Sequence, residues 1–260
     1  MKITALVENT TKTDWPVEHG LSLFIETGNH CILFDTGQST LFAENAKRLG
    51  INLEEADICI LSHGHYDHGG GLKEFVRINQ KASIYMNQNA FGLHYHGKDR
   101  YIGLPRQWLR DLELQNRIVY TNGDAVIDDE LMLCVPLREK RVLMGSAGLC
   151  VKENGNFIPE EFLHEHYLMI HENEKHVLIS GCSHQGIINI MDWYQPDVLV
   201  GGFHFMKQEC NDILIEYGKM LSEYDAEYYT CHCTGVEQYE FLKHYMNRIH
   251  YLSEGEMIKI

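Results

Sequence analysis

The 260 residues include 37 acidic and 22 basic side chains, which gives a formal net charge of −15 at pH 7. Contacts to nucleic-acid phosphates need a surplus of Lys and Arg, so this charge argues against a DNA or RNA partner. The hydrophobic content of 44% and the charged content of 23% are ordinary for a globular protein, and the length fits a single domain over residues 1–260.

The expected location is the cytoplasm. No stretch approaches the ~18 uninterrupted apolar residues of a membrane-spanning helix, so we expect no membrane partner. The first apolar run meets Glu8 before a signal sequence could develop. Several of the eight cysteines lie in apolar runs, which predicts buried thiols rather than disulfides. Composition leaves self-association into a homo-oligomer open.

The N-terminal third alternates strand and turn patterns. Strands are predicted over residues 2–7, 21–27, 30–34 and 58–61. Gly28-Asn29 predicts a hairpin turn of the kind that needs positive φ. Apolar spacing predicts helices over 39–49, ended by Gly50, and over 72–78. This alternation indicates helices packed on a sheet.

Six residues after the strand at 58–61 carry most of the predicted chemistry. His63-Gly-His65-Tyr-Asp67-His68 places three imidazoles and one carboxylate close together, where the rings would repel one another unless a cation gathers their lone pairs. Zinc, iron and manganese accept these ligand types. Residues two apart on an extended segment project to the same side, so His63 and His65 can bind one ion. The adjacent Asp67 and His68 should face different positions, which predicts a second ion.

The middle of the chain has weaker patterns. Residues 90–117 show no clear pattern, and within them His94 and His96 repeat the spacing of the first pair without a nearby carboxylate, in a segment that fits an exposed loop or lid. We therefore expect them to line a substrate pocket rather than to bind metal. Residues 119–151 are predicted to form a β-meander. The loop also carries three arginines that either meet an anionic substrate or are solvated: Arg100, Arg106 and Arg110.

The C-terminal half repeats one pattern three times. Apolar strands over 177–180, 197–200 and 227–230 each lead to a histidine that follows glycine or cysteine within a few residues, namely His184, His204 and His232. Ligand sites of layered α/β folds lie at strand ends, so three such ends indicate a site. Further strands are predicted over 167–170, 248–252 and 257–260, and helices over 187–193, 208–224 and 236–246.

The segment His63–His68 resembles the HxHxDH signature of the metallo-β-lactamase-fold hydrolases. Other segments recur in the branch of that superfamily related to dihydropterin-(ribofuranosyl)aminobenzene-phosphate synthase, and together they cover essentially the whole chain. These segments are Glu18-His19-Gly20-Leu21-Ser22-Leu23, Leu33-Phe34-Asp35-Thr36-Gly37, Gly181-Cys182-Ser183-His184-Gln185-Gly186, Gly201-Gly202-Phe203-His204 and His232-Cys233-Thr234-Gly235. The resemblance implies an α/β fold, a four-layer αββα sandwich, with one or two divalent metal ions at the edge between its sheets.

The resemblance also implies a ligand set. In the superfamily the first motif supplies four ligands, a later histidine completes the first ion, an acid bridges both ions and a last histidine completes the second. The implied ligands here are His63, His65, Asp67, His68 and His184, with His204 and His232 competing for the last position.

Two positions depart from the superfamily pattern, and a third is ambiguous. Cys182 stands where the bridging acid is usual. His164-Glu165-His166 replaces the usual Gly-His-Thr loop, and its histidines are either ligands or parts of a polar loop near the mouth of the site. Asp35, at a strand end, either orients ligands or caps the following segment.

The predicted activity is that of a metal-dependent hydrolase. The ion is expected to be zinc, with iron or manganese as alternatives. It would lower the pKa of a bound water towards ~7 and polarise a phosphoryl or carbonyl oxygen. Asp67 is the predicted catalytic residue, which orients that water or accepts its proton. The expected substrate is a small, anionic molecule that is phosphorylated or an ester.

Three other functions remain open. The branch name implies a synthase or transferase that uses a dihydropterin pyrophosphate. The same fold also hosts di-iron redox sites. A non-catalytic metal or ligand sensor would use Cys231-His232-Cys233, which also suggests a structural zinc site, although such sites normally have four ligands in CxxC-like spacing.

Overall fold

The computed structural model describes residues 1–110, 116–136, 139–140, 142 and 148–260, with the backbone alone at 109 and 110. The chain divides into two compact units. Unit 1 comprises Met1–Asn122, Gly145–His166 and Ser253–Ile260, and unit 2 comprises Gly123–Met144 and Tyr167–Leu252. Both combine helices with sheets. The expectation of a single domain stays a prediction.

The main sheet of unit 1 has an antiparallel and a parallel half. Its order is β18 (Met257–Lys259), β1 (Lys2–Val7), β2 (Ser22–Glu26), β3 (Cys31–Phe34), β4 (Ile58–Ile60), β5 (Ser83–Asn87) and β8 (Ile118–Thr121). Neighbours from β18 to β3 are antiparallel, and those from β3 to β8 are parallel. Parallel neighbours bring the ends of β3 and β4 to the same edge of the sheet.

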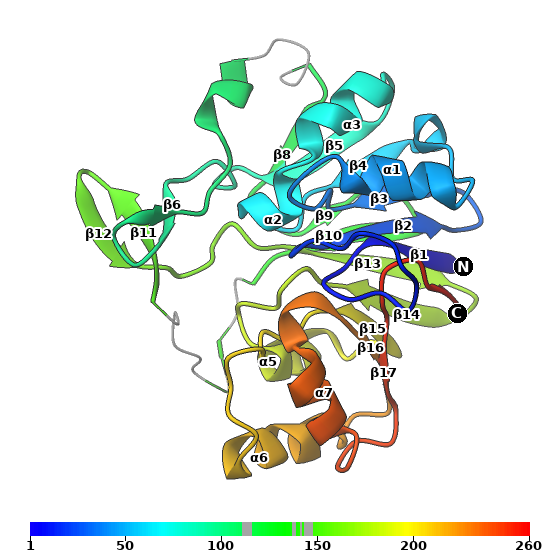
Figure 1. The fold of residues 1–260 in the computed structure, drawn as a ribbon, viewed down its shortest axis with the longest axis vertical. Helices are drawn as coiled ribbons and strands as arrows, with labels where there is room; N and C mark the ends of the chain where they lie inside the picture. The colour runs from blue at the N-terminus through cyan, green and yellow to red at the C-terminus, as the bar shows by residue number, and fades with distance from the viewer. Residues whose placement is uncertain (111–115, 137–138, 141, 143–147) are drawn as a thin grey trace. The chain divides into compact units, whose positions relative to one another are not determined.

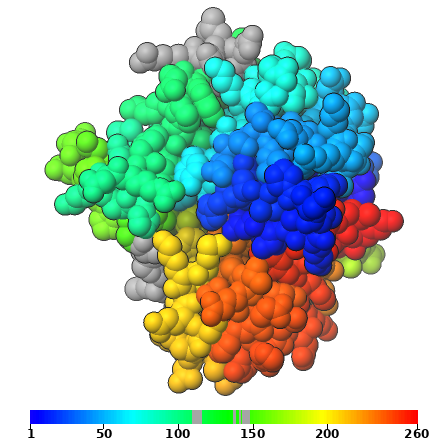
Figure 2. Space-filling view, viewed as in Figure 1, coloured from blue at the N-terminus to red at the C-terminus, as the bar shows by residue number. Residues whose placement is uncertain are grey.

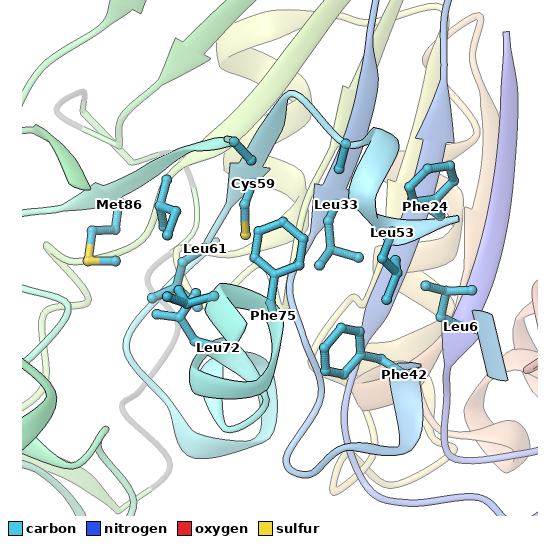
Figure 3. Packing of buried hydrophobic residues seen from close by; sticks show 14 of the residues in the cluster. Leu6, Phe24, Leu33, Phe42, Leu53, Cys59, Leu61, Leu72, Phe75 and Met86 are labelled. Atoms are coloured by element: carbon cyan, nitrogen blue, oxygen red, sulfur yellow. The ribbon is translucent and has the colours of Figure 1, made fainter. Parts of the chain in front are cut away.

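Two helices cover one face of this sheet, α1 (Leu41–Arg48) and α3 (Leu72–Ile78) (Figure 1). Phe42 of α1 and Phe75 of α3 point toward Leu33 and Cys59 of the strands, and all four are buried (Figure 3). Leaving water stabilises the fold by about 2 kcal/mol for each such Leu or Phe. The short elements η1 (Leu53–Glu55) and α2 (Tyr66–Gly69) precede β4 and α3.

A small separate sheet includes part of residues 90–117, where the sequence patterns are weak. Its order is β12 (Asn156–Pro159), β11 (Leu149–Glu153), β6 (His94–His96) and β7 (Arg100–Tyr101), and the 3-10 helix η2 (Arg106–Arg110) follows. The prediction missed this sheet because β6 pairs with β11, more than 50 residues further along the chain. In Figure 2 its residues, coloured in greens, form one stretch of surface.

Unit 2 repeats the strand pattern of unit 1. Its sheet has the order β17 (Ile249–Tyr251), β16 (Glu227–Thr230), β15 (Val198–Gly201), β14 (Lys175–Ile179), β13 (Tyr167–Glu172), β10 (Leu131–Cys134) and β9 (Ala125–Val126). Neighbours from β17 to β14 are parallel, and those from β14 to β9 are antiparallel. The helices α5 (Ile187–Tyr194), α6 (Asp212–Leu221) and α7 (Val236–Leu242) pack on it (Figure 1).

Two local predictions are wrong. Residues 119–151 form no β-meander, because β8 joins the main sheet of unit 1, β9 and β10 join the sheet of unit 2, and β11 joins the small sheet. The hairpin between β2 and β3 exists, but neither Gly28 nor Asn29 has positive φ. The Thr27 hydroxyl instead closes the turn by accepting from the backbone N–H groups of Asn29 and His30.

Helix boundaries differ from the predictions mainly at the ends. Helix α3 has the predicted bounds, whereas α6 and α7 are shorter than predicted. The Asn211 side chain accepts from Ile213 N–H and so starts α6 at Asp212. Among the described residues, no helix has the length and apolar character needed to cross a membrane.

Candidate metal centre

The loop after β4 depends on a glycine. A Cβ at Gly64 would overlap the carbonyl oxygen of Ala90, so no other residue fits between His63 and His65. The Gly64 N–H donates to His164 Nδ1 over 2.8 Å, and His166 N donates to Ser62 O over 2.9 Å. The segment at 164–166 therefore holds the loop from one side.

The first two histidines of the motif face each other. His63 Nε2 lies 3.1 Å from His65 Nδ1. Two nitrogens bound tetrahedrally to one zinc at ~2.0–2.1 Å lie about 3.3 Å apart, close to the distance found here. Both side chains are buried, His63 completely. The pair thus has the donor type and the spacing for one divalent ion, as the i, i+2 spacing predicted.

One buried carboxylate sets the proton positions around these rings. Asp35, fully buried at the end of β3, accepts from Ser62 N, Ser62 Oγ and His68 Nδ1, each over 2.7 Å. Because the Ser62 hydroxyl gives its proton to Asp35, the contact of 2.8 Å between Ser62 Oγ and His63 Nδ1 requires His63 to donate. In the neutral form of both rings, Nε2 of His63 and Nε2 of His68 then keep their lone pairs.

The same carboxylate also changes the proton affinity of His68. Burial alone would lower the pKa of His68, but the charge and hydrogen bond of Asp35 outweigh it, so that this pKa is raised. Asp35 also has φ of 57°, a conformation that only a few residue types other than Gly, Asp among them, adopt readily. Asp35 therefore orients His68 and Ser62, as one of its two predicted roles required.

Asp67 has a partner that the sequence analysis did not single out. His19 Nε2 lies 3.1 Å from Asp67 Oδ2, and His19 Nδ1 lies 3.2 Å from the Asn9 amide nitrogen. Since the amide donates to Nδ1, the His19 proton sits on Nε2 and faces the carboxylate. Asp67 and His68 thus turn to different partners, as predicted. The signal for His19 was its place in the recurrent segment Glu18-His19-Gly20.

The three later candidates lie at strand ends of unit 2. His204 follows β15 and His232 follows β16, with φ of 57° and 49°, and Ser183, next to His184, has φ of 57°. Backbone in this region costs about 1–3 kcal/mol for such residues and is concentrated at functional positions. The rings of His184 and His204 have centroids 4.4 Å apart. Unit 2 therefore brings His184 and His204 together, while His232 stands in the separate turn η3 (His232–Thr234).

Three cysteines near the strand ends of unit 2 are buried thiols. Cys233 Sγ donates to the Cys182 carbonyl over 3.4 Å, and both residues and Cys231 are buried. Among the described residues, neither Cys231 nor Cys233 belongs to a group of three potential metal ligands. This observation counts against the structural zinc site suggested by Cys231-His232-Cys233.

The two histidines of the second pair, His94 and His96, differ in burial. His94 is 2% exposed and its Nδ1 lies 2.7 Å from Glu160 Oε2, whereas His96 is exposed.

The other histidine and arginine candidates of unit 1 have separate surroundings. Burial lowers the pKa of His166 to about 4. The Arg110 side chain lies outside the described residues, and Arg100 donates to the Tyr66 hydroxyl over 3.0 Å.

An aromatic cavity of about 620 Å³ opens beside the motif in unit 1. Tyr66 of the motif lines it, as do Arg106 and several residues of the small sheet and the segment after it. The aromatic members of this set are Tyr66, Tyr95, Tyr101 and Trp108.

Family membership follows from comparison with known proteins. The profile of the Metallo-beta-lactamase superfamily matches residues 15–224. The chain belongs to this superfamily. Its members are mostly hydrolytic enzymes, and its fold generally binds divalent metal ions. The described residues include groups of histidine, aspartate and cysteine side chains that could hold such an ion.

A solved structure confirms the fold. Tm1679, a metal-dependent hydrolase of the beta-lactamase superfamily, matches with a TM-score of 0.84 and 29% identity, over 100% of this chain and 99% of that chain. The predicted mixed α/β class of the metallo-β-lactamase type is therefore correct.

Two proteins of Methanocaldococcus jannaschii are similar over nearly their full lengths. The uncharacterized protein MJ0448 is 30% identical over 267 residues, which are 99% of this chain and 100% of that protein. The 7,8-dihydropterin-6-methyl-4-(beta-D-ribofuranosyl)-aminobenzene-5'-phosphate synthase is 27% identical over 286 residues, 100% of this chain and 96% of the synthase. The predicted relation to the synthase branch is confirmed.

Proposed function

We propose that this chain is a metal-dependent hydrolase that acts through a metal-activated water on a small, anionic substrate, phosphorylated or an ester. One observation carries the proposal: the buried Asp35 carboxylate leaves lone pairs on Nε2 of both His63 and His68. A carboxylate that only capped the next segment would bond to backbone N–H groups there. Asp35 bonds instead to Ser62 and to the His68 ring, an arrangement typical of residues that orient metal ligands.

The proposed ion is zinc, with iron or manganese as alternatives, and one or two ions bind per chain. When bound, such an ion lowers the pKa of a water towards ~7 and polarises a substrate oxygen. Asp67 is proposed to orient that water, held by His19 at Oδ2. The proposed ligands in unit 1 are His63, His65, Asp67 and His68, and those in unit 2 are His184, His204 and His232.

The surroundings proposed for the reaction follow from charge and composition. We propose a cytoplasmic protein whose partner is a small molecule rather than nucleic acid or a membrane, because a net charge of −15 repels anionic surfaces. Self-association is compatible with this proposal.

A synthase or transferase reaction is the second candidate. Its support is the similarity to the synthase of Methanocaldococcus jannaschii over the whole chain, together with the aromatic cavity beside Tyr66. Aromatic walls suit a ring-bearing substrate, because stacked rings attract beyond simple burial. A redox protein or a sensor has no comparable support among the described residues.

Metal content and turnover together test the proposal. We would measure metals in the purified chain by elemental analysis and follow a chromogenic phosphodiester and a thioester. His63→Ala should lower the metal content and abolish turnover, whereas His96→Ala, an exposed histidine of unit 1, should change neither. Metal content that His63→Ala leaves unchanged would refute the ligand assignment. Full metal content without turnover of either probe would favour the transferase.

A further inference from the structure

Unit 1 contains another cavity, of about 500 Å³, formed by the small sheet and the segments that flank it. Its volume is in the range of small-molecule sites. Ile158 and Leu163 are 41% and 48% exposed and line it, so apolar surface is open to a ligand. The other apolar residues of the lining are Phe91, Leu93, Val151 and Pro159.

The charges on this lining nearly balance. The positive charges of Arg106 and Lys152 equal in number the negative charges of Glu153 and Glu161. The remaining carboxylate, Glu160, lies with its Oε2 2.7 Å from His94 Nδ1. A cavity for an anion would carry a surplus of positive charge. The lining therefore favours an uncharged molecule.

One buried ring nitrogen of a residue that lines the cavity, His164 Nε2, makes no hydrogen bond within the described part of the chain. His164 is 1% exposed, and its Nδ1 accepts from the Gly64 N–H over 2.8 Å. A ring nitrogen that accepts a hydrogen bond carries no proton, so the proton of His164 sits on Nε2. Among the described residues Nε2 has no hydrogen-bond partner, and Glu160 Oε1 lies 3.9 Å away. Buried donors without an acceptor are rare and costly, which indicates that a ligand supplies one.

A metal ion would be the obvious occupant, because ring nitrogens of His65, His94 and His164 lie within 4.8 Å of one another. The proton positions argue against it. The protonated Nε2 of His164 has no lone pair to offer a cation. His94 likewise faces two acceptors, with Glu160 Oε2 at 2.7 Å and the Asn89 carbonyl at 3.3 Å. The ring of His164 therefore presents a donor rather than a metal ligand, and a neutral His94 can donate to only one of its two acceptors.

We propose that this cavity binds an uncharged organic molecule with an apolar body and one acceptor, a carbonyl oxygen or a ring nitrogen, which accepts from His164 Nε2–H. The ligand would then be connected through His164 and the Gly64 N–H to the loop that carries His63 and His65. The inference goes beyond the proposed function, since it requires neither a metal nor turnover.

Two fluorinated probes test it by ¹⁹F NMR on the full chain: 4-fluorobenzamide, which has an acceptor, and fluorobenzene, which has none. The wild-type chain should bind the amide about threefold to tenfold more tightly, the effect of one hydrogen bond. His164→Asn keeps an acceptor near Nδ1 for Gly64 but loses the Nε2 donor, so the preference should vanish. His164→Gln places an amide donor near the position of Nε2, so this variant should retain the preference for 4-fluorobenzamide.

A second pair of variants tests the apolar walls without touching His164. Ile158→Lys should weaken the binding of both probes. Ile213→Lys, at a position of α6 that is 49% exposed and does not line the cavity, should weaken the binding of neither. No binding of either probe, equal affinity for both, or a preference that survives in His164→Asn would overturn the proposal. Loss of one bound zinc in His94→Gln would also overturn it in favour of a metal site.

Discussion

Replacing Glu254 by Gln should stabilise the protein in alkaline but not in acidic solution. Glu254 is 1% exposed, its backbone N–H donates to the Thr10 carbonyl, and the fully buried Glu8 is nearby. Burial, with a contribution from the charge of Glu8, raises the pKa of Glu254 to about 7, from an ordinary value of 4.5. An ionised Glu254 therefore destabilises the folded chain.

The size and sign of the effect follow from proton binding. The unfolded chain releases this proton near pH 4.5 and the folded chain near pH 7, so between these values the folded state binds more protons. The free energy of unfolding consequently falls as the pH rises through this window and stays low above it. The difference between 7 and 4.5, at 1.36 kcal/mol per pKa unit, corresponds to about 3 kcal/mol.

Urea denaturation at several pH values measures the effect. Glu254→Gln should raise the free energy of unfolding by about 1–3 kcal/mol at about pH 8.5 and by less than about 0.5 kcal/mol at about pH 4. Glu44→Gln, whose side chain is 59% exposed, serves as the control and should show no such dependence. An equal effect at both pH values, or destabilisation at the higher one, would refute the reasoning.

Three further substitutions probe the candidate metal centre. Asp35→Asn places an amide against His68 and should weaken metal binding by about 10- to 100-fold, measured by titration with zinc; unchanged affinity would remove the orienting role. Gly64→Ala forces a Cβ onto backbone and should lower the melting temperature and the metal content, whereas Gly123→Ala, with open space around it, should do neither. Thr234→Val leaves the buried N–H of Phe203 without its acceptor and should lower the free energy of unfolding, measured by urea denaturation, by about 1–3 kcal/mol. A smaller loss would mean that another group accepts the hydrogen bond from this N–H.

The predictions that the structure confirms depended on residues that are close together in the sequence. His63, His65 and His68 are close in sequence to one another, so strand geometry alone predicted that two of them face each other. The burial of Phe75 and its neighbours follows from the apolar spacing that also predicted α3 with its observed bounds. The small sheet was missed because its strands are short and find their partners far along the chain.

The sequence by itself determined the superfamily, the mixed α/β class and the positions where strands end in histidine, because each of these depends on spacing within a few residues. Only the tertiary structure decided which nitrogen of each ring carries the proton. The residues that decide it lie far away in sequence: Asp35 acts on His68 across 33 residues, and Gly64 acts on His164 across 100. A ring's role as metal ligand or hydrogen-bond donor depends on those partners, and chain folding alone brings them together.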